Sequence, residues 1–202
     1  MSNQEINKTQ GKRANTMHSL KMKIFLLVFI AIIFAISLCL LMIVPKSKSN
    51  LETVIENYMK DITVVEGENL DRDLANEGAD TVLSAEALQD DLKGISISGM
   101  PSSYAYIFSG TDGTMLYHPT ADKIGLPVEN AAAKQLLTEI GEGKKPEPSV
   151  IEYEFKGKQK YAAYYIGNEA AFVLIITADG DEVFASLNET TNYSLIGALV
   201  LI

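Results

Sequence analysis

The longest hydrophobic segment of the chain lies near its N-terminus, between Ile24 and Val44. These 21 positions carry no charged side chain, and a helix of about 20 apolar residues matches the hydrocarbon thickness of a bilayer. A cleaved signal peptide is the alternative, but its apolar core is usually about 7–15 residues long and a cleavage site of small residues follows it. Here Pro45 and Lys46 follow instead. The pattern therefore predicts an uncleaved transmembrane helix over residues 24–44, preceded by a tail of residues 1–23.

Beyond this segment, hydrophobic positions recur at spacings of three and four residues, which is typical of an amphipathic helix. Residues 66–80 are mostly polar, and we expect Gly67 and Gly78 to break the helix there. A second helix is predicted from Thr81 to Lys93, because Gly94 follows it as a stop signal. The apolar stripe of the first helix consists of Leu51, Val54, Ile55, Tyr58, Met59, Ile62 and Val65.

From about residue 103 the hydrophobic period becomes that of β-strands, with turn residues between the segments. Hairpin connections make sequential strands antiparallel neighbours. The pattern predicts an α+β, PAS-like fold, in which a five-stranded antiparallel sheet has a long N-terminal helix on one face. A mid-domain helix and loops cover the other face, and the usual cavity lies beneath them. The predicted elements are a hairpin at 103–118, a helix at 128–140, strands at 150–155, 159–166 and 170–178, and a helix at 181–192.

Charge divides the chain at the apolar segment. The tail has five basic residues and one acidic residue, whereas residues 45–192 hold 12 basic and 25 acidic residues, a net charge of −13. Positively charged flanks stay on the cytoplasmic side of a membrane. We therefore predict that the N-terminus is cytoplasmic and that the domain of residues 45–192 is extracytoplasmic. This acidity also excludes nucleic acid as a partner, because phosphate backbones are bound by clustered Lys and Arg.

The last ten residues, 193–202, are mostly apolar but too few to span a bilayer. We interpret them as the start of a second transmembrane helix, with a buried strand as the alternative. The single cysteine, Cys39, lies in the first apolar segment, so the outer domain must be stabilised by its hydrophobic core rather than by disulfides. Without a Cys/His cluster, we expect neither a bound metal nor a cofactor.

The outer domain offers no catalytic set of residues. Its one histidine is His118, and nucleophilic catalysis needs a base within reach of the nucleophile. Glycine-rich phosphate motifs are missing as well. Glu152 and Glu154 are two residues apart on a predicted strand, which favours a solvated face over an acid–base pair. The chain is therefore not expected to be an enzyme.

Tyrosines and basic residues near the strands are the candidates for a ligand site, because small-solute sites are mostly apolar with a few polar groups. Strand alternation places Lys160 and Tyr164 on one face and Tyr161 and Tyr165 on the other, and the sequence leaves open which face lines the cavity. For each candidate an ordinary core or surface role is the alternative, and Lys123 is assigned to the surface. The candidate ligand-binding residues are Tyr106, Tyr117, His118, Tyr153, Lys160 and Tyr164.

At this point the sequence resembles a known family. The segment AYIFSGTDGTMLYHPTADKIGLPVEN, followed by YEFKGKQKYAAYY and a strand ending in ITADGDEV, resembles single-module Cache sensor domains, more closely those of methyl-accepting chemotaxis receptors. The resemblance covers about residues 45–202 and implies a domain that binds small extracellular solutes, often short carboxylates. The arginine–tryptophan–tyrosine–aspartate set of amino-acid-binding members is absent, since the chain has no Trp and its only outer arginine is Arg72.

Together these observations predict the sensing portion of a membrane chemoreceptor. The expected ligand is an organic anion of two to four carbons, such as lactate, pyruvate or acetate. Three alternatives stay open: the sensor of a histidine kinase or cyclase, a pyrimidine or amino-acid ligand, and a protein-binding adhesion domain. The stripe of Leu51, Val54, Tyr58 and Ile62 further predicts a parallel homodimer, although the sheet could use the same stripe.

Overall fold

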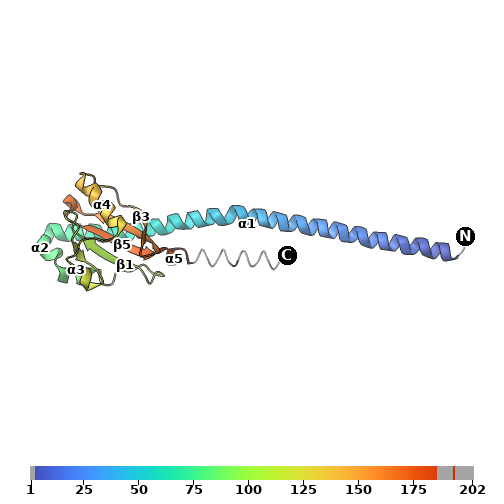
Figure 1. Ribbon diagram of the computed structural model, residues 1–202, viewed down its shortest axis with the longest axis horizontal. Coiled ribbons are helices and arrows are strands. Elements are labelled where there is room, and N and C mark those ends of the chain that lie inside the picture. Colours follow the sequence, from blue (N-terminus) through green and yellow to red (C-terminus); the bar gives the residue numbers. More distant parts are fainter. Residues whose placement is uncertain (1–2, 186–192, 194–202) are drawn as a thin grey trace. The chain divides into compact units, whose positions relative to one another are not determined.

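A computed structural model describes residues 3–185 and residue 193, with side chains described from Leu20 onward except at Lys48. The described residues from Ser49 onward to residue 185 belong to one compact unit, and those up to Lys48 belong to another; Figure 1 shows the elements of both. Among the described residues, one helix is long and apolar enough to cross a membrane. Its apolar side chains are exposed, as at Phe25 and Leu41. The predicted second span at residues 193–202 lies outside the described residues apart from Tyr193.

Helix α1 extends from Asn3 to Glu77 and continues through Pro45. The prediction of a break at Gly67 was wrong, whereas Gly78 does end the helix with φ of 82°. A glycine in this helix is required by packing: a Cβ at Gly67 would lie 2.2 Å from a ring carbon of Tyr165. Glycine lowers helix stability by only about 1 kcal/mol relative to alanine. The helix therefore continues through Gly67, and the contact with Tyr165 explains why this position has no side chain.

The sheet has five strands in the order β2-β1-β5-β4-β3, and all neighbours are antiparallel. The central strand β5 is buried at all seven positions, which agrees with its nearly continuous apolar sequence. The predicted fold class is confirmed for the helix and the sheet. The strands are β1 (Tyr104–Phe108), β2 (Met115–Tyr117), β3 (Val150–Phe155), β4 (Lys158–Ile166) and β5 (Val173–Asp179).

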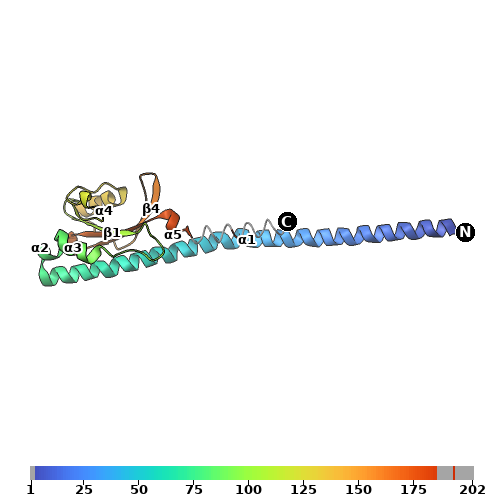
Figure 2. The same ribbon diagram turned by 90° about the horizontal axis from the view of Figure 1, so that it is seen from below.

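Each face of the sheet carries its own hydrophobic core, and Figure 2 shows α1 and α4 on opposite sides of it. On the α1 face, Met59 packs with residues such as Ile107 and Ile176. On the other face, Ala133 and Leu136 of α4 (Ala131–Gly141) pack with the neighbouring strand positions. The pattern follows from strand alternation, since successive side chains point to opposite faces.

Short helices complete the unit, and polar side chains set where some of them begin. The predicted helix at 81–93 is divided into α2 (Ala79–Val82) and α3 (Ala85–Leu92), because the Ser84 side chain caps α3 by accepting a hydrogen bond from the Ala87 amide at 3.3 Å. The predicted helix at 128–140 begins later, since Asn130 caps α4. The remaining short helices are η1 (Ala121–Lys123), η2 (Asn168–Ala170) and α5 (Gly180–Val183). Most of the predicted C-terminal helix at 181–192 lies outside the described residues.

Candidate functional site

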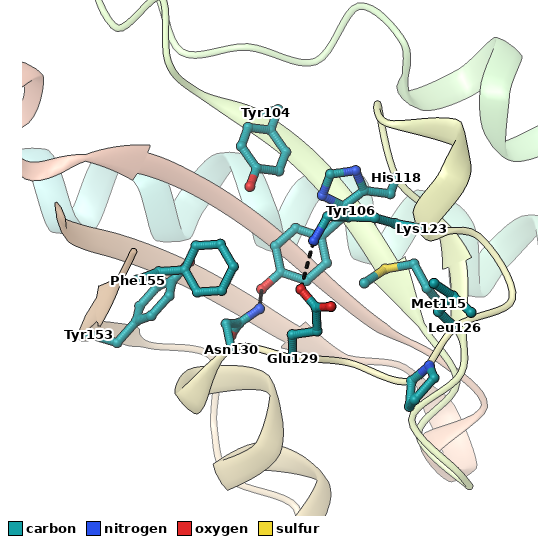
Figure 3. Close-up of a pocket in the computed structure, with 11 residues that line it drawn as sticks. Tyr104, Tyr106, Met115, His118, Lys123, Leu126, Glu129, Asn130, Tyr153 and Phe155 are labelled. Carbon is teal, nitrogen blue, oxygen red and sulfur yellow. Dashed lines mark hydrogen bonds and ion pairs between the residues drawn. The ribbon is translucent and has the colours of Figure 1, made fainter. Parts of the chain in front are cut away.

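A pocket lies on the α4 side of the sheet, where the loop between β2 and α4 passes over β1 and β3 (Figure 3). The space available to the centres of water-sized molecules is about 30 Å³, and one water needs about 10–15 Å³. The pocket therefore suits a ligand of very few atoms. Its lining consists of Tyr104, Tyr106, Met115, His118, Lys123, Leu126, Pro127, Glu129, Asn130, Tyr153 and Phe155.

Three tyrosines from two strands that are not neighbours form the aromatic wall. Tyr104 and Tyr106 lie two residues apart on β1, with ring centroids 6.1 Å apart. Tyr153 comes from β3 and reaches across the sheet, so that its hydroxyl lies 3.3 Å from Oγ1 of Thr177 on β5. Small residues make this reach possible, because Thr177 pairs with Ala162 on the intervening strand β4.

These phenols keep their protons at neutral pH. Burial raises the pKa of Tyr104 to about 12, with smaller contributions from Tyr153 and Asp179. Burial also raises the pKa of Tyr153, and raises that of the fully buried Tyr106 well above its ordinary value. A neutral phenol has one O–H to donate. The Tyr153 hydroxyl donates its proton to Thr177, because the Thr177 hydroxyl itself donates to the Tyr161 carbonyl at 2.9 Å. The wall therefore carries no negative charge, and Tyr104 is the tyrosine whose O–H can turn toward a ligand.

His118 contributes a further donor beside the tyrosines. Its Nδ1 accepts a hydrogen bond from the Thr120 amide at 2.9 Å, and its ring lies edge-on to Tyr104 at a centroid distance of 5.3 Å. Burial, followed by the nearby charge of Lys123, lowers the pKa of His118. The ring is thus neutral above its ordinary pKa of about 6.5. Because Nδ1 is the acceptor, the proton resides on Nε2, which leaves an N–H to donate.

The polar rim comes from the loop after β2 and from the start of α4. The Lys123 ammonium lies 2.9 Å from a carboxylate oxygen of Glu129. Asn130 has two roles, since its Oδ1 caps α4 at Ala133 and its Nδ2 donates to the Tyr106 hydroxyl at 2.9 Å. Figure 3 shows the Lys123–Glu129 and Asn130–Tyr106 contacts as dashed lines. Among the lining residues, Lys123 and Glu129 are the two that are ionised at neutral pH.

The structure brings three of the six predicted site residues together, namely Tyr106, His118 and Tyr153. Lys160 and Tyr164 lie on the same face of the sheet but do not line the pocket. Lys160 forms an ion pair with Asp179, and its ammonium is 5.7 Å from the ring centroid of Tyr104. The Tyr164 hydroxyl donates to the carbonyl of Glu147 at 2.8 Å.

Tyr117 lies on the opposite face of the sheet, in the core beside α1. Simple alternation would place it with Met115, which lines the pocket. A bulge changes this, because Phe108 pairs with Met115 while Ile107 pairs with Tyr117, so that Leu116 is the extra residue. A bulge reverses the side on which the following residue points.

Five polar or aromatic lining residues were not predicted from the sequence: Tyr104, Lys123, Glu129, Asn130 and Phe155. Lys123 was assigned to the surface, and its side chain is in fact 29% exposed at the rim. One available signal was Tyr104, since it is two residues before Tyr106 on the same strand. For Asn130, the cue was its position as a helix-capping residue before the alanine-rich segment.

No family model and no curated protein matches the chain. Among solved structures it is similar to a methyl-accepting chemotaxis protein from Vibrio parahaemolyticus, with 10% sequence identity, a TM-score of 0.51, and coverage of 69% of this chain and 98% of that one. It is also similar to a Cache chemosensory domain described for carboxylic acid recognition, with 14% identity, a TM-score of 0.44, and coverage of 62% and 92%.

A third similar structure is the ligand-binding domain of Mlp24 with asparagine, with 14% identity, a TM-score of 0.37 and coverage of 51% of this chain. The chain spans 38% to 39% of the length of that domain and of two histidine kinase extracellular domains. The chain therefore shares its fold with the methyl-accepting chemotaxis protein from Vibrio parahaemolyticus.

Proposed function

We propose that this chain is the sensing portion of a transmembrane chemoreceptor and that its pocket binds a small organic anion of two to four carbons. The observation that carries the proposal is the composition of the pocket. The neutral hydroxyl of Tyr104, the Nε2–H of His118 and the ammonium of Lys123 line one small space between an aromatic wall and a polar rim. Carboxylates accept such donors, and hydrogen bonds to a charged group are about twice as strong as neutral ones.

The size of the ligand limits its affinity. The best small ligands gain about 1.5 kcal/mol per non-hydrogen atom. Acetate is therefore expected to bind with a dissociation constant of about tens of micromolar or weaker, and lactate at best near about one micromolar. A pocket of about 30 Å³ is consistent with ligands in this size range.

The proposed organisation follows the charge pattern: a cytoplasmic tail at 1–23, a transmembrane helix at 24–44, an extracytoplasmic sensor at 45–192 and a second membrane helix beginning at 193. The apolar segment of α1 fits a membrane span by length and composition. We further propose a homodimer, and chemotaxis as the output. A phosphoacceptor helix and ATPase domain after Ile202 in the gene would identify a histidine kinase instead.

A binding screen of the 202-residue chain in detergent micelles tests the ligand class. We expect acetate, lactate or pyruvate to give heat on titration, and amino acids and uracil to give none. Tyr104→Phe removes a lining hydroxyl and should weaken binding about tenfold, the loss typical of a hydrogen bond to a charged group. Tyr164→Phe is the matched control, since its hydroxyl bonds Glu147 outside the pocket. Binding of neutral compounds alone would contradict the proposal.

A further inference from the structure

Glu129 is the one acidic residue among those that line the pocket. It forms an ion pair with Lys123, the lysine that a carboxylate ligand would contact. Its carboxylate is 2.9 Å from the Lys123 ammonium. The hydrogen bond and charge of Lys123 lower the pKa of Glu129, with smaller contributions from Lys156 and Lys134, neither of which lines the pocket. Glu129 is therefore ionised at neutral pH, as a carboxylate ligand is. An incoming anion must share Lys123 with a fixed negative charge.

No second cation within the described lining is free to take another carboxylate. Lys160 lies beneath Tyr104 but is held by Asp179 on β5. The Lys156 ammonium lies 5.3 Å from the ring centroid of Phe155, and Lys156 is not part of the lining. A ligand with one carboxylate can contact Lys123. In a ligand with two carboxylates, the second negative charge would lie against Glu129 or against the aromatic wall. Like charges brought together in a partly desolvated site are strongly unfavourable.

Resting on the proposed function, we propose that Glu129 is a specificity residue that restricts the pocket to monocarboxylates. It acts by repulsion, which is how many sites reject close analogues. It also competes with the ligand for Lys123, so that it lowers monocarboxylate affinity to a smaller extent. The pocket thus gives up some affinity in order to discriminate by the number of charges.

Pocket size is a competing cause, because dicarboxylates are often larger. Pyruvate and oxalate separate the two causes, since they contain the same number of non-hydrogen atoms and differ by one charge. Glu129→Gln is nearly isosteric and removes the charge without enlarging the space. Asp122→Asn removes the same charge from η1, one residue from Lys123, and Asp122 does not line the pocket.

The test is calorimetric titration of the 202-residue chain in micelles with pyruvate and with oxalate, for the unmodified chain and both variants. We expect the unmodified chain to prefer pyruvate. In Glu129→Gln the pyruvate affinity should rise by about two- to fivefold, the scale of an exposed ion pair. The preference for pyruvate over oxalate should fall by about tenfold in the same variant, and Asp122→Asn should leave the preference unchanged.

The outcomes separate this inference from the proposed function. If the unmodified chain binds no carboxylate, the proposed function fails. If it binds pyruvate and Glu129→Gln keeps the same preference, the proposed function stands and the role of Glu129 is refuted. Glu129→Lys offers a second readout, because a reversed charge should favour oxalate over pyruvate. Circular dichroism checks folding, which we expect to be retained because the Glu129 side chain is 61% exposed.

Discussion

Gly67 shows how one residue allows two elements, α1 and β4, to pack closely. The ring of Tyr165 covers the helix at this position, and its hydroxyl donates to Asp71 one turn further along α1 at 2.8 Å. The other carboxylate oxygen of Asp71 accepts the Asn168 amide at 2.9 Å. Both contacts fix α1 against the end of β4, and the ring fits only where the helix lacks a side chain.

We therefore expect Gly67→Ala to destabilise the sensor unit. Alanine gains about 1 kcal/mol of helix propensity, but overpacking a filled site costs about 1–3 kcal/mol, so the net effect is a loss of up to about 2 kcal/mol. Gly141→Ala is the control, because this glycine lies in α4 with no atom within 4 Å of the added Cβ. Urea denaturation in micelles measures both variants. An unchanged or higher free energy of unfolding for Gly67→Ala would show that Tyr165 moves aside freely.

The pair of Lys160 and Asp179 gives a pH-dependent contribution to stability. Hydrogen bonds from Lys158 and Lys160 lower the pKa of Asp179 in the folded state. A lowered carboxyl pKa stabilises the fold above the unfolded value of about 3.9, and this contribution is lost as the pH falls through the folded value. Lys160 and Asp179 are both buried. Removal of one charge would therefore leave the other buried charge without an opposite charge beside it.

Asp179→Asn should cost about 3–5 kcal/mol at pH 7, as expected when one partner of a buried ion pair is removed. The difference from the unmodified chain should shrink as the pH falls from about 4, the unfolded carboxyl pKa, toward the lowered pKa of Asp179 in the folded state. Free energies of unfolding at several pH values provide the measurement. Lys160→Met combined with Asp179→Asn should recover part of the loss, and a constant difference across the acid range would contradict the assignment.

At the scale of elements, the apolar stripe of α1 is divided between two uses. Met59 is fully buried against the sheet and Ile62 is partly buried there. Val54, Tyr58 and Val65 are exposed, with 48% to 60% of each residue accessible. The stripe is thus only partly used by the core, which leaves a row of apolar side chains that suits a second copy of the helix.

Cysteines at Leu51 and Val54, in a Cys39→Ser background, should cross-link readily in membranes if the row forms the proposed dimer. Membrane tethering raises the effective concentration, so the experiment belongs in membranes rather than in dilute solution. Met59→Cys is the internal control, because a fully buried position should react little. Failure of both the half-buried Leu51 position and the exposed Val54 position to cross-link would assign the row to another role.

At the scale of the whole molecule, the sheet is connected to the C-terminal end of the sensor through α5. Strand β5 passes directly into Gly180–Val183. Ser102 holds this junction: its amide and hydroxyl donate to Glu182 at 2.8 and 2.5 Å, and its Oγ accepts the Asp179 amide at 2.9 Å. Through Asp179 the junction is joined to Lys160, which contacts the ring of the pocket residue Tyr104.

We expect that insertion of a few glycines after Asp181 in the complete receptor leaves ligand affinity intact and abolishes the signalling response. The reason is that a ligand changes output only through its different affinity for two states of the protein, and a flexible insertion disconnects those states from the C-terminal segment. Titration measures binding, and a cellular response assay measures output. An unchanged response in the insertion variant would place the route elsewhere.

The sequence alone determined the order and type of the elements, because hydrophobic periodicity is a local property of the chain. The alternation in residues 150–155 predicted β3 at its observed bounds, and Tyr106 and Tyr153 were recognised as candidates from their strands. Only the tertiary structure decided which of these side chains meet. The bulge at Leu116 moved Tyr117 to the other face, and the loop after β2 brought Lys123 and Glu129 to the rim. The physical reason is that hydrophobic periodicity determines which residues of one strand or helix share a face. Which residues of other segments pack against that face, and so line the pocket, depends on contacts between segments that are distant in the sequence.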